Sequence, residues 1–319
     1  MRPPRLEELP ASPEGKIGWP WTEASDPQTE FRLYGSAWPK ISVVTPSFNQ
    51  GQFIEETIRS VLLQSYPNLE LIIIDGGSTD NTLEIIKKYE PWIAYWVSEP
   101  DRGQSHAINK GIGKATGDIL FWLNSDDLVL SCAFERIGKV FVDNPETKMV
   151  IGQAKVIDAQ GNEIGDLLSN FTTWEDLVTT PHNQVRQVST FFSKQLFDEC
   201  GLVNEEIEIA MDIEFFSRLT RDHEPTGIPD FVSSFRVQDQ SKSYLNTIKG
   251  YVEVDCFRRQ LLRDNALFPK YAAASSENWM NMAKREKSDI KSRFTCLKNA
   301  MEMNPKIIFD RRFWFLLFY

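Results

Sequence analysis

The chain has 319 residues with a formal net charge of −10; 41% of the residues are hydrophobic and 25% are charged. These values are typical of a globular protein with one large domain and extensions, or with two domains. The four scattered cysteines contain no CxxC pair, which argues against a disulfide framework or a zinc site. No signal peptide and no run of about eighteen apolar residues is present, so we expect a cytoplasmic protein without a membrane-spanning helix.

The first 123 residues open with an arm and continue as alternating strands and helices. Residues 1–38 are rich in Pro, Glu and Ser and predict an extended arm, held to the body by Trp19 and Trp21. Continuous apolar runs predict buried strands at 41–47, 69–75, 93–99 and 117–123. Helical spacing and capping residues predict helices at 51–64, 78–89 and 103–115. This alternation predicts an α/β fold with a mostly parallel sheet that is covered by helices on both faces.

The following part is less regular, and the C-terminal part is helical and basic. The pattern predicts a strand at 148–158, a turn at 161–166, and helices at 174–180, 193–200 and 211–223. From Leu245 to Tyr319 the chain has 14 Lys and Arg against 8 Asp and Glu, whereas the remainder has 21 against 37. An acidic body and a basic tail indicate that the two parts face different surroundings.

The C-terminal segment allows two interpretations. It could be a helical pair that covers one edge of the domain. It could instead be a monotopic anchor, whose basic residues meet anionic lipid while apolar residues enter the membrane interface. The residues that would enter are Phe313, Trp314, Phe315, Leu316, Leu317 and Phe318. Ile290, Phe294, Leu297 and Met301 form an apolar stripe among lysines and arginines in the same segment.

Polar residues follow each of the four predicted strands. The strand ends read Thr45-Pro46-Ser47-Phe48-Asn49, Asp75-Gly76-Gly77-Ser78-Thr79-Asp80, Glu99-Pro100-Asp101-Arg102-Gly103 and Asn124-Ser125-Asp126-Asp127. Ligands of open parallel sheets bind outside the carboxyl ends of the strands. Caps and turns would explain one or two such ends, but they explain four converging ends poorly. We therefore predict a ligand site at this edge.

The residue types at these ends favour a nucleotide diphosphate. Asp75 could accept hydrogen bonds from a base or ribose, and the glycines after it would let a planar ring approach the backbone. Asp126, alone or with a neighbour, could hold Mg²⁺ or Mn²⁺, which prefer oxygen ligands. That cation would neutralise a diphosphate that an acidic body would otherwise repel. No P-loop motif is present, and the spacing of the glycines in "GIGKATG" is wrong for a dinucleotide fingerprint.

The helix that follows the first predicted strand carries three charged residues. Glu55, Glu56 and Arg59 predict a solvated helix face, and we assign them no role in the site.

Two long segments resemble family 2 glycosyltransferases with the GT-A fold, of the bacterial polysaccharide type. They are "TPSFNQGQFIEETIRSVLLQSYPNLELIIIDGGSTDNT" and "SEPDRGQSHAINKGIGKATGDILFWLNSDD", and "VRQVSTFFSKQLFDECGLVNEEIEIAMDIEFFSRL" resembles the acceptor-side segment of the same enzymes. The resemblance implies an N-terminal arm at 1–38, a GT-A domain at 39–243 and a helical extension at 244–319.

The resemblance also implies a role for each matching residue. Asp212 would be the catalytic base, and Asn124 and Asp126 stand at the D-x-D motif, so that Asp126 is the first choice for the metal. Asp127 would lie beside the donor sugar or the metal. The residues that would hold the nucleoside and diphosphate, or support their loops, are Pro46, Ser47, Asn49, Asp75, Asp80, Arg102 and Lys110.

Two residues depart from the family pattern. The first motif position is the amide Asn124 where the family has an acid, and Gln238 stands where the family often has a histidine that completes the metal site. We therefore expect a metal, Mg²⁺ or Mn²⁺, that is held with reduced affinity.

The implied activity is an inverting sugar transfer from a nucleotide-sugar to a hydroxyl of a glycan or lipid-linked acceptor. The donor is a UDP-sugar first, with GDP- and dTDP-sugars as alternatives, and we expect no nucleic-acid partner. The location is the cytoplasm, with the inner face of the plasma membrane as the alternative if the C-terminal segment is an anchor. A catalytically silent member that binds sugar nucleotide is the alternative function. A nucleotidyltransferase should have a basic phosphate loop, and "TPSFNQGQ" contains no Lys or Arg.

Overall fold

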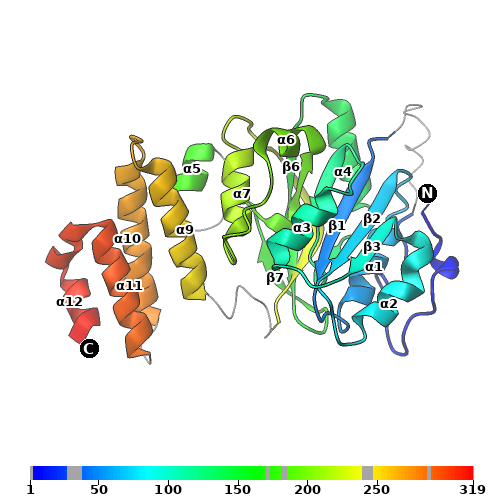
Figure 1. The fold of residues 1–319 in the computed structure, drawn as a ribbon, viewed down its shortest axis with the longest axis horizontal. Coiled ribbons are helices and arrows are strands. Elements are labelled where there is room, and N and C mark those ends of the chain that lie inside the picture. The colour runs from blue at the N-terminus through cyan, green and yellow to red at the C-terminus, as the bar shows by residue number, and fades with distance from the viewer. Residues whose placement is uncertain are drawn as a thin grey trace. The chain divides into compact units, whose positions relative to one another are not determined.

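The computed structural model describes residues 3–26, 38–169, 173–180, 185–238, 247–285 and 289–318. The chain divides into two compact units (Figure 1). The first comprises Met1–Asn170 with Val185–Ser241, and the second comprises Phe171–Gln184 with Lys242–Tyr319. The predicted boundary at residues 243 and 244, and residues 27–37 of the predicted arm, lie outside the described residues.

The first unit is built on a nine-stranded sheet with the order β3-β2-β1-β4-β8-β6-β9-β5, and β7 pairs with β6. The strands are β1 (Ile41–Ser47), β2 (Leu69–Asp75), β3 (Tyr95–Ser98), β4 (Ile119–Trp122), β5 (Leu128–Val129), β6 (Met149–Ile157), β7 (Glu163–Leu167), β8 (Thr190–Ser193) and β9 (Thr226–Arg236). The four strands from β3 to β4 are parallel, as predicted. β8 runs antiparallel to both of its neighbours, so the far half of the sheet is mixed.

Helices pack on this sheet because their apolar faces match its buried strands. They are α1 (Ile54–Leu62), α2 (Thr82–Tyr89), α3 (Gln104–Ile112), α4 (Ala133–Asp143), α6 (Lys194–Cys200) and α7 (Met211–Leu219), with 3₁₀ turns η1 (Leu6–Glu8), η3 (Glu90–Trp92) and η4 (Gln187–Ser189). Helix α3 lies across β1 and β2 (Figure 1). The core contains fully buried residues of β1, β2 and α1, such as Ile41, Ile73 and Val61. The predicted α/β class is confirmed.

One predicted element is wrong, and four helices and strands that the structure describes in the first unit were not identified from the sequence. Residues 161–166, predicted as a turn, enter strand β7, which pairs antiparallel with β6. Four of the five residues of β7 are exposed and the fifth is half-buried, so it lacks the apolar alternation that predicts a strand. The four that were not identified are helix α4 and strands β5, β8 and β9.

The N-terminal arm is fixed to the first unit by a buried arginine. Arg59 is 1% exposed and donates to the carbonyls of Pro10 (2.8 Å), Pro20 (3.1 Å) and Trp21 (2.8 Å). Its guanidinium also lies 5.4 Å from the centre of the Trp21 ring, and the indole of Trp19 donates to the carbonyl of Val129 at 2.9 Å. The interpretation of Arg59 as part of a solvated face is therefore wrong, because the arm covers it.

The second unit is a helical bundle. It contains α5 (Trp174–Thr179), α9 (Thr247–Leu262), α10 (Phe268–Arg285), α11 (Ile290–Met303), η5 (Pro305–Phe309) and α12 (Arg311–Phe318). Buried Arg258 donates to the carbonyls of Thr180 (2.6 Å) and Leu177 (2.7 Å) and so ties α5 to α9. Buried Asp255 accepts from the Ser275 hydroxyl at 2.7 Å and also from Tyr271 and Trp279.

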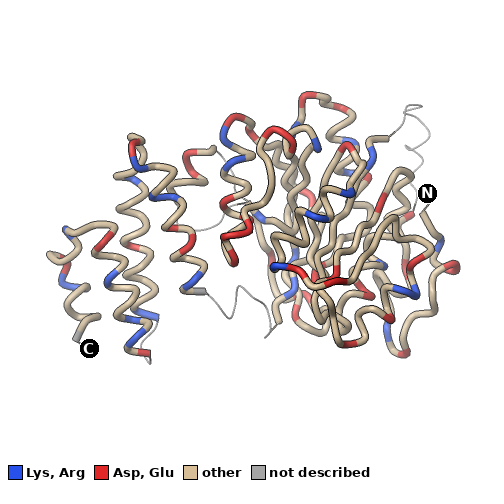
Figure 2. Tube along the Cα trace, in the orientation of Figure 1, with Lys and Arg blue, Asp and Glu red and all other residues tan. Residues whose placement is uncertain are grey.

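The aromatic residues of the C-terminal segment divide between the interior and the surface of the second unit. Phe313 and Leu316 are buried in its core, so the expectation that these two face a membrane is wrong. Trp314 and Phe315 are exposed. Basic positions outnumber acidic ones along α10 and α11, and α12 has two arginines and no acidic residue (Figure 2). Within the described ranges, no helix is both long and apolar enough to cross a membrane.

Candidate active site

Strand register brings the predicted site residues to one edge of the sheet. Ser47 pairs with Asp75 across β1 and β2, and Asp75 pairs with Ser98 across β2 and β3. On the other side of β1, Val44 pairs with Trp122 of β4, so Asn124 leaves the sheet at the same edge. The predicted convergence of the strand ends follows from this parallel register.

Asp75 shapes the loop that follows β2. Its carboxylate is completely buried and accepts hydrogen bonds from the backbone of Gly77 (3.1 Å) and Ser78 (2.8 Å), and from the hydroxyls of Ser78 (2.5 Å) and Ser98 (2.6 Å). Gly77 has φ = +88°, a conformation that favours glycine. Direct contact between Asp75 and a nucleoside stays a prediction, because these four bonds already hold the carboxylate.

Asn49 and Asp80 lock the β1 and β2 loops together. Asn49 has φ = +51° and accepts from the backbone of Thr79 at 2.9 Å. Asp80 accepts from the backbone of Gly51 (2.9 Å) and Thr82 (3.0 Å). Partial burial of Asp80 favours its neutral form, but hydrogen bonds from Thr82 and Gly51 outweigh it and lower the pKa of the carboxyl. Asp80 therefore supports the loop that follows β2.

Two hydroxyls at the end of β1 are buried without a hydrogen-bond partner among the described residues. They are Ser47 Oγ and Thr45 Oγ1, on either side of buried Pro46. An unsatisfied buried hydroxyl costs about 1–3 kcal/mol. A ligand or water that hydrogen-bonds Ser47 would remove this cost, so the edge of β1 is suited to a polar ligand.

Asn124 is held by four side-chain hydrogen bonds. Its oxygen accepts from Gln104 Nε2 and Trp122 Nε1, both at 2.8 Å. Its nitrogen donates to Asp127 Oδ2 at 3.2 Å and to Gln187 Oε1 at 3.1 Å. A carboxylate at position 124 could accept the first two bonds but could not donate the other two. The amide at the first motif position is therefore matched to its neighbours.

Asp127 is the buried member of the acidic pair. Its side chain is 1% exposed, and it accepts from the backbone of Arg236 at 2.9 Å and from Asn124. Thr57 of α1 donates to its carbonyl at 2.8 Å. Burial, and next the charge of Asp126, raise the pKa of Asp127 well above its ordinary value. Contact between Asp127 and a sugar or metal stays a prediction.

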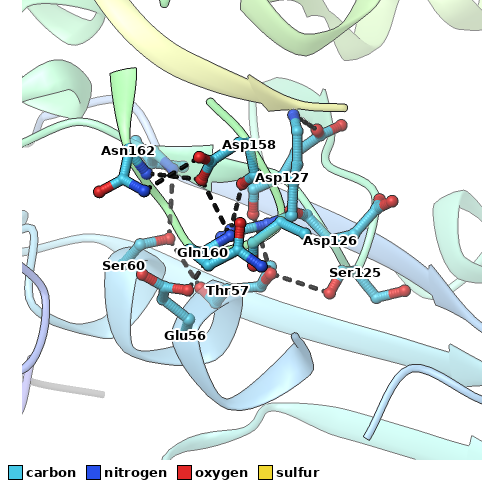
Figure 3. A network of polar contacts seen from close by, with 12 residues as sticks. Glu56, Thr57, Ser60, Ser125, Asp126, Asp127, Asp158, Gln160 and Asn162 are labelled. Carbon is cyan, nitrogen blue, oxygen red and sulfur yellow. Dashed lines mark hydrogen bonds and ion pairs between the residues drawn. The ribbon is translucent and has the colours of Figure 1, made fainter. Parts of the chain in front are cut away.

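Asp126 is more accessible and is held from β9. Gln238 Nε2 donates to its carboxylate Oδ2 at 3.0 Å, and Arg236 Nε donates to its carbonyl at 2.8 Å. Burial raises the pKa of Asp126, while Gln238 and Arg236 oppose the rise. Arg236 is itself 1% exposed and forms an ion pair with Glu56 of α1 at 2.8 Å. Figure 3 shows Glu56 close to the loop of Asp126 and Asp127, so the expected solvated face is wrong for Glu56 as well.

The charges of this cluster fit a divalent cation. Burial opposes ionisation of the neighbouring carboxyls of Asp126 and Asp127, and a bound cation would favour their ionised forms. The described ranges contain no group of three His, Cys, Asp or Glu that could hold a metal by themselves. Mg²⁺ and its analogues are commonly held by one or two carboxylates together with substrate phosphates. The residues present therefore fit a cation that takes its remaining ligands from a diphosphate and water.

Arg102 and Lys110, predicted near the base or diphosphate, are paired with carboxylates. Arg102 donates to Glu205 at 2.7 and 3.0 Å, and its side chain is 68% exposed. Lys110 on α3 pairs with Glu99, at the end of β3. Their role toward a ligand stays a prediction.

Asp212 lies in the first turn of α7 and is partly buried. Its carboxylate accepts from the backbone of Ile213 at 2.8 Å. Burial raises the pKa of Asp212 to about 6, and backbone hydrogen bonds and the charge of Arg186 limit the rise. Arg186 precedes Gln187, which contacts Asn124 and the carbonyl of Trp122. Arg186, whose charge acts on Asp212, and Gln187, which contacts Asn124, therefore connect Asp212 with the loop of Asp126.

Sequence reasoning missed the residues that hold the acidic loop in place. They are Glu56, Gln104, Gln187 and Arg236. Arg236 is 110 residues from Asp126 in sequence, so the local pattern could not reveal their contact. The signal available was weaker: a charged residue that ends the largely apolar run "FVSSFR".

Comparisons with known proteins agree with this fold. The model of glycosyl transferase family 2 matches residues 42–196. An uncharacterized glycosyltransferase of Mycobacterium tuberculosis is 34% identical over 200 residues, which cover 60% of this chain and 72% of that protein. The putative teichuronic acid biosynthesis glycosyltransferase TuaG of Bacillus subtilis is 42% identical over 92 residues, 28% of this chain and 36% of that protein.

Solved structures show the same fold. S. aureus TarS has a TM-score of 0.56 at 17% identity, over 87% of this chain and 55% of that chain. A complex of TarS residues 1–349 with UDP has a TM-score of 0.55 at 16% identity, over 85% of this chain and 92% of that chain. The sheet with its flanking helices has the GT-A fold. The chain belongs to glycosyl transferase family 2 and is a glycosyltransferase enzyme.

Proposed function

We propose that the enzyme transfers a sugar, with inversion, from a nucleotide-diphosphate sugar to an acceptor hydroxyl. The observation that carries the proposal is the contrast between two carboxylate environments. Asp126 lies beside the more deeply buried Asp127, whose pKa it raises, and a bound cation would neutralise this acidic pair and a diphosphate together. Asp212 is separate, partly buried and has a pKa near 6, which suits a general base at neutral pH.

Asp212 accepts the proton of the acceptor hydroxyl as its oxygen attacks the anomeric carbon. General base catalysis of this kind contributes about 10²–10⁴-fold. No second carboxylate is assigned as a nucleophile, so a single displacement inverts the anomeric configuration. Asp126, in the loop fixed by Asn124 and Asp127, holds Mg²⁺ or Mn²⁺. When bound, the cation neutralises the departing diphosphate.

The nucleotide is proposed to lie against the ends of β1 and β2. Ser47 Oγ offers a buried hydroxyl without a partner among the described residues, and Asn49 with Asp80 holds the adjoining loops. Arg102 and Lys110 are proposed to turn to the base or diphosphate when it binds. TarS, a structural relative, has been solved with UDP and with UDP-GlcNAc, which supports a UDP-sugar as the donor.

The acceptor is proposed to be a cell-surface glycan or its lipid-linked precursor. TuaG, a partial relative, is named for teichuronic acid biosynthesis. The second unit exposes four large aromatic side chains: Phe309 (83%), Phe315 (62%), Phe294 (50%) and Trp314 (47%). Exposed Lys291, Lys306 and Arg311 belong to the same elements, α11, η5 and α12. Aromatic and basic residues together favour contact with an anionic membrane surface, and we propose peripheral attachment at the inner face of the plasma membrane.

A thermal-shift screen with sugar nucleotides, with and without Mn²⁺, tests the donor proposal. Mn²⁺ with a UDP-sugar should raise the melting temperature, and Asp126→Asn should remove the metal-dependent part of the increase. The silent alternative, a protein that binds sugar nucleotide without turnover, is separated by measuring release of UDP from the donor. Release that depends on Asp212 supports the enzyme, and binding without release supports the alternative.

A further inference from the structure

We propose that Gln238 is a positioning residue for Asp126: its amide holds one carboxylate oxygen, so that the other faces the cation. This inference rests on the proposed function, because it assigns Asp126 to a metal. Gln238 itself is not proposed to touch the metal, the donor or the acceptor.

The last residue of β9, Arg236, and Gln238 just beyond it hold Asp126 at two points. Arg236 Nε donates to the Asp126 carbonyl at 2.8 Å, and Gln238 Nε2 donates to Asp126 Oδ2 at 3.0 Å. Arg236 and Gln238 therefore fix the backbone and the side chain of the same residue from neighbouring positions of the chain.

The first of these donors is rigidly anchored. The Arg236 guanidinium is 1% exposed, pairs with Glu56 at 2.8 Å and donates to the carbonyl of Asp158 at 3.1 Å. It also lies 5.0 Å from the centre of the Phe53 ring. Since α1, the β6–β7 turn and β9 all meet at this side chain, the position of the Asp126 backbone is set by three elements of the first unit.

The side-chain amide of Gln238, the second donor, is chemically suited to orienting the Asp126 carboxylate. Gln238 is 9% exposed, so its bond to Asp126 is shielded from water. A neutral amide orients a carboxylate without cancelling its charge, whereas a lysine or arginine at this position would compete with the cation. Asp127 contrasts with Asp126, because backbone and amide donors reach both of its oxygens. Asp126 is the motif carboxylate whose orientation depends on a single side-chain contact in the described part of the chain.

The experiment measures the dissociation constant of Mn²⁺ by electron paramagnetic resonance, with and without saturating UDP. It compares wild type with Gln238→Met, which keeps the side-chain volume, and Gln238→Asn, which keeps an amide but is too short to keep the contact. Loss of an outer-shell partner typically weakens metal binding about 10–100-fold, and we expect that loss for both variants in the presence of UDP. Gln195→Met, an exposed glutamine on α6, is the matched control and should bind as wild type. Circular dichroism confirms that each variant is folded.

The outcomes separate this inference from the proposed function. A loss of tenfold or more in the folded variants, with the control unchanged, supports Gln238 as the positioning residue. A loss of less than tenfold, or tighter binding, overturns it while the proposed metal use stands. If wild type itself binds no Mn²⁺ in the presence of UDP, the proposed metal use is overturned, and the inference with it.

Discussion

The substitution Asp212→Asn should make the protein more stable at neutral pH while it removes activity. The pKa of Asp212 rises from 3.8 to about 6 in the folded protein, chiefly through burial. Below pH 3.8 the carboxyl is neutral in both the folded and unfolded states and contributes no difference. As pH rises from 3.8 to about 6, the unfolded state ionises first, so the free energy of unfolding falls. Above pH 6 the full penalty is present.

The size of the effect follows from the pKa difference. A shift of roughly two units corresponds to about 3 kcal/mol at 1.36 kcal/mol per unit. Asp212 is only partly buried, so solvent screening lowers the value, and we expect about 1–2 kcal/mol. Asparagine keeps an oxygen that can accept the hydrogen bond from Ile213. The variant should therefore gain stability above pH 6 and match wild type near pH 3.8.

The assay is urea unfolding of wild type and Asp212→Asn at pH 4 and pH 7.5, with the difference in unfolding free energy compared between the two pH values. The second unit is identical in both proteins, so its contribution cancels. Asp222→Asn, an exposed position just beyond α7, is the matched control and should change stability by less than about 0.5 kcal/mol. A destabilised Asp212→Asn at pH 7.5, or a gain of equal size at pH 4, would refute the reasoning.

Three further variants test other parts of the structure. Asn124→Asp places a carboxylate against Asp127 and removes two donated hydrogen bonds. It should lower the free energy of unfolding in urea at pH 7.5 by about 1–3 kcal/mol. Unchanged stability would contradict the role of the amide. Arg59→Met leaves the carbonyls of the arm without their donor. It should lower the free energy of unfolding by about 3 kcal/mol and expose residues 3–26 to proteolysis. An arm that stays protected would show that other contacts hold it. Phe309→Ser with Phe315→Ser should reduce co-sedimentation with anionic vesicles several-fold at unchanged melting temperature, and equal binding would exclude these side chains as the membrane contact.

The strands that the sequence predicts accurately are those in which almost every residue is buried. β1 and β2 agree with the predicted strands to the residue, because each is a continuous apolar run between polar turn residues. β7 was missed because most of its residues are exposed at the sheet edge. β8 has four residues and is too short to show a period.

The site was predictable where it depends on sheet register and not where it depends on distant contacts. Parallel pairing of β1 with β2 and β4 was enough to bring the strand ends together. The contacts of Arg236 and Gln238 with Asp126 span 110 and 112 residues, and no local pattern announces them. Glu56 and Arg59 look solvated on a helical wheel, but long-range partners cover both.

The most direct test of the central claim is donor turnover by Asp212→Asn at saturating UDP-sugar and Mn²⁺. We assign binding of the cation and the diphosphate to the Asp126 loop, and removal of the acceptor proton to Asp212. In Asp212→Asn we therefore expect UDP release to fall by about 10²–10⁴-fold. The dissociation constant for UDP with Mn²⁺ should stay within twofold of wild type. Turnover above one tenth of wild type, or an equal loss of UDP binding, would contradict this assignment.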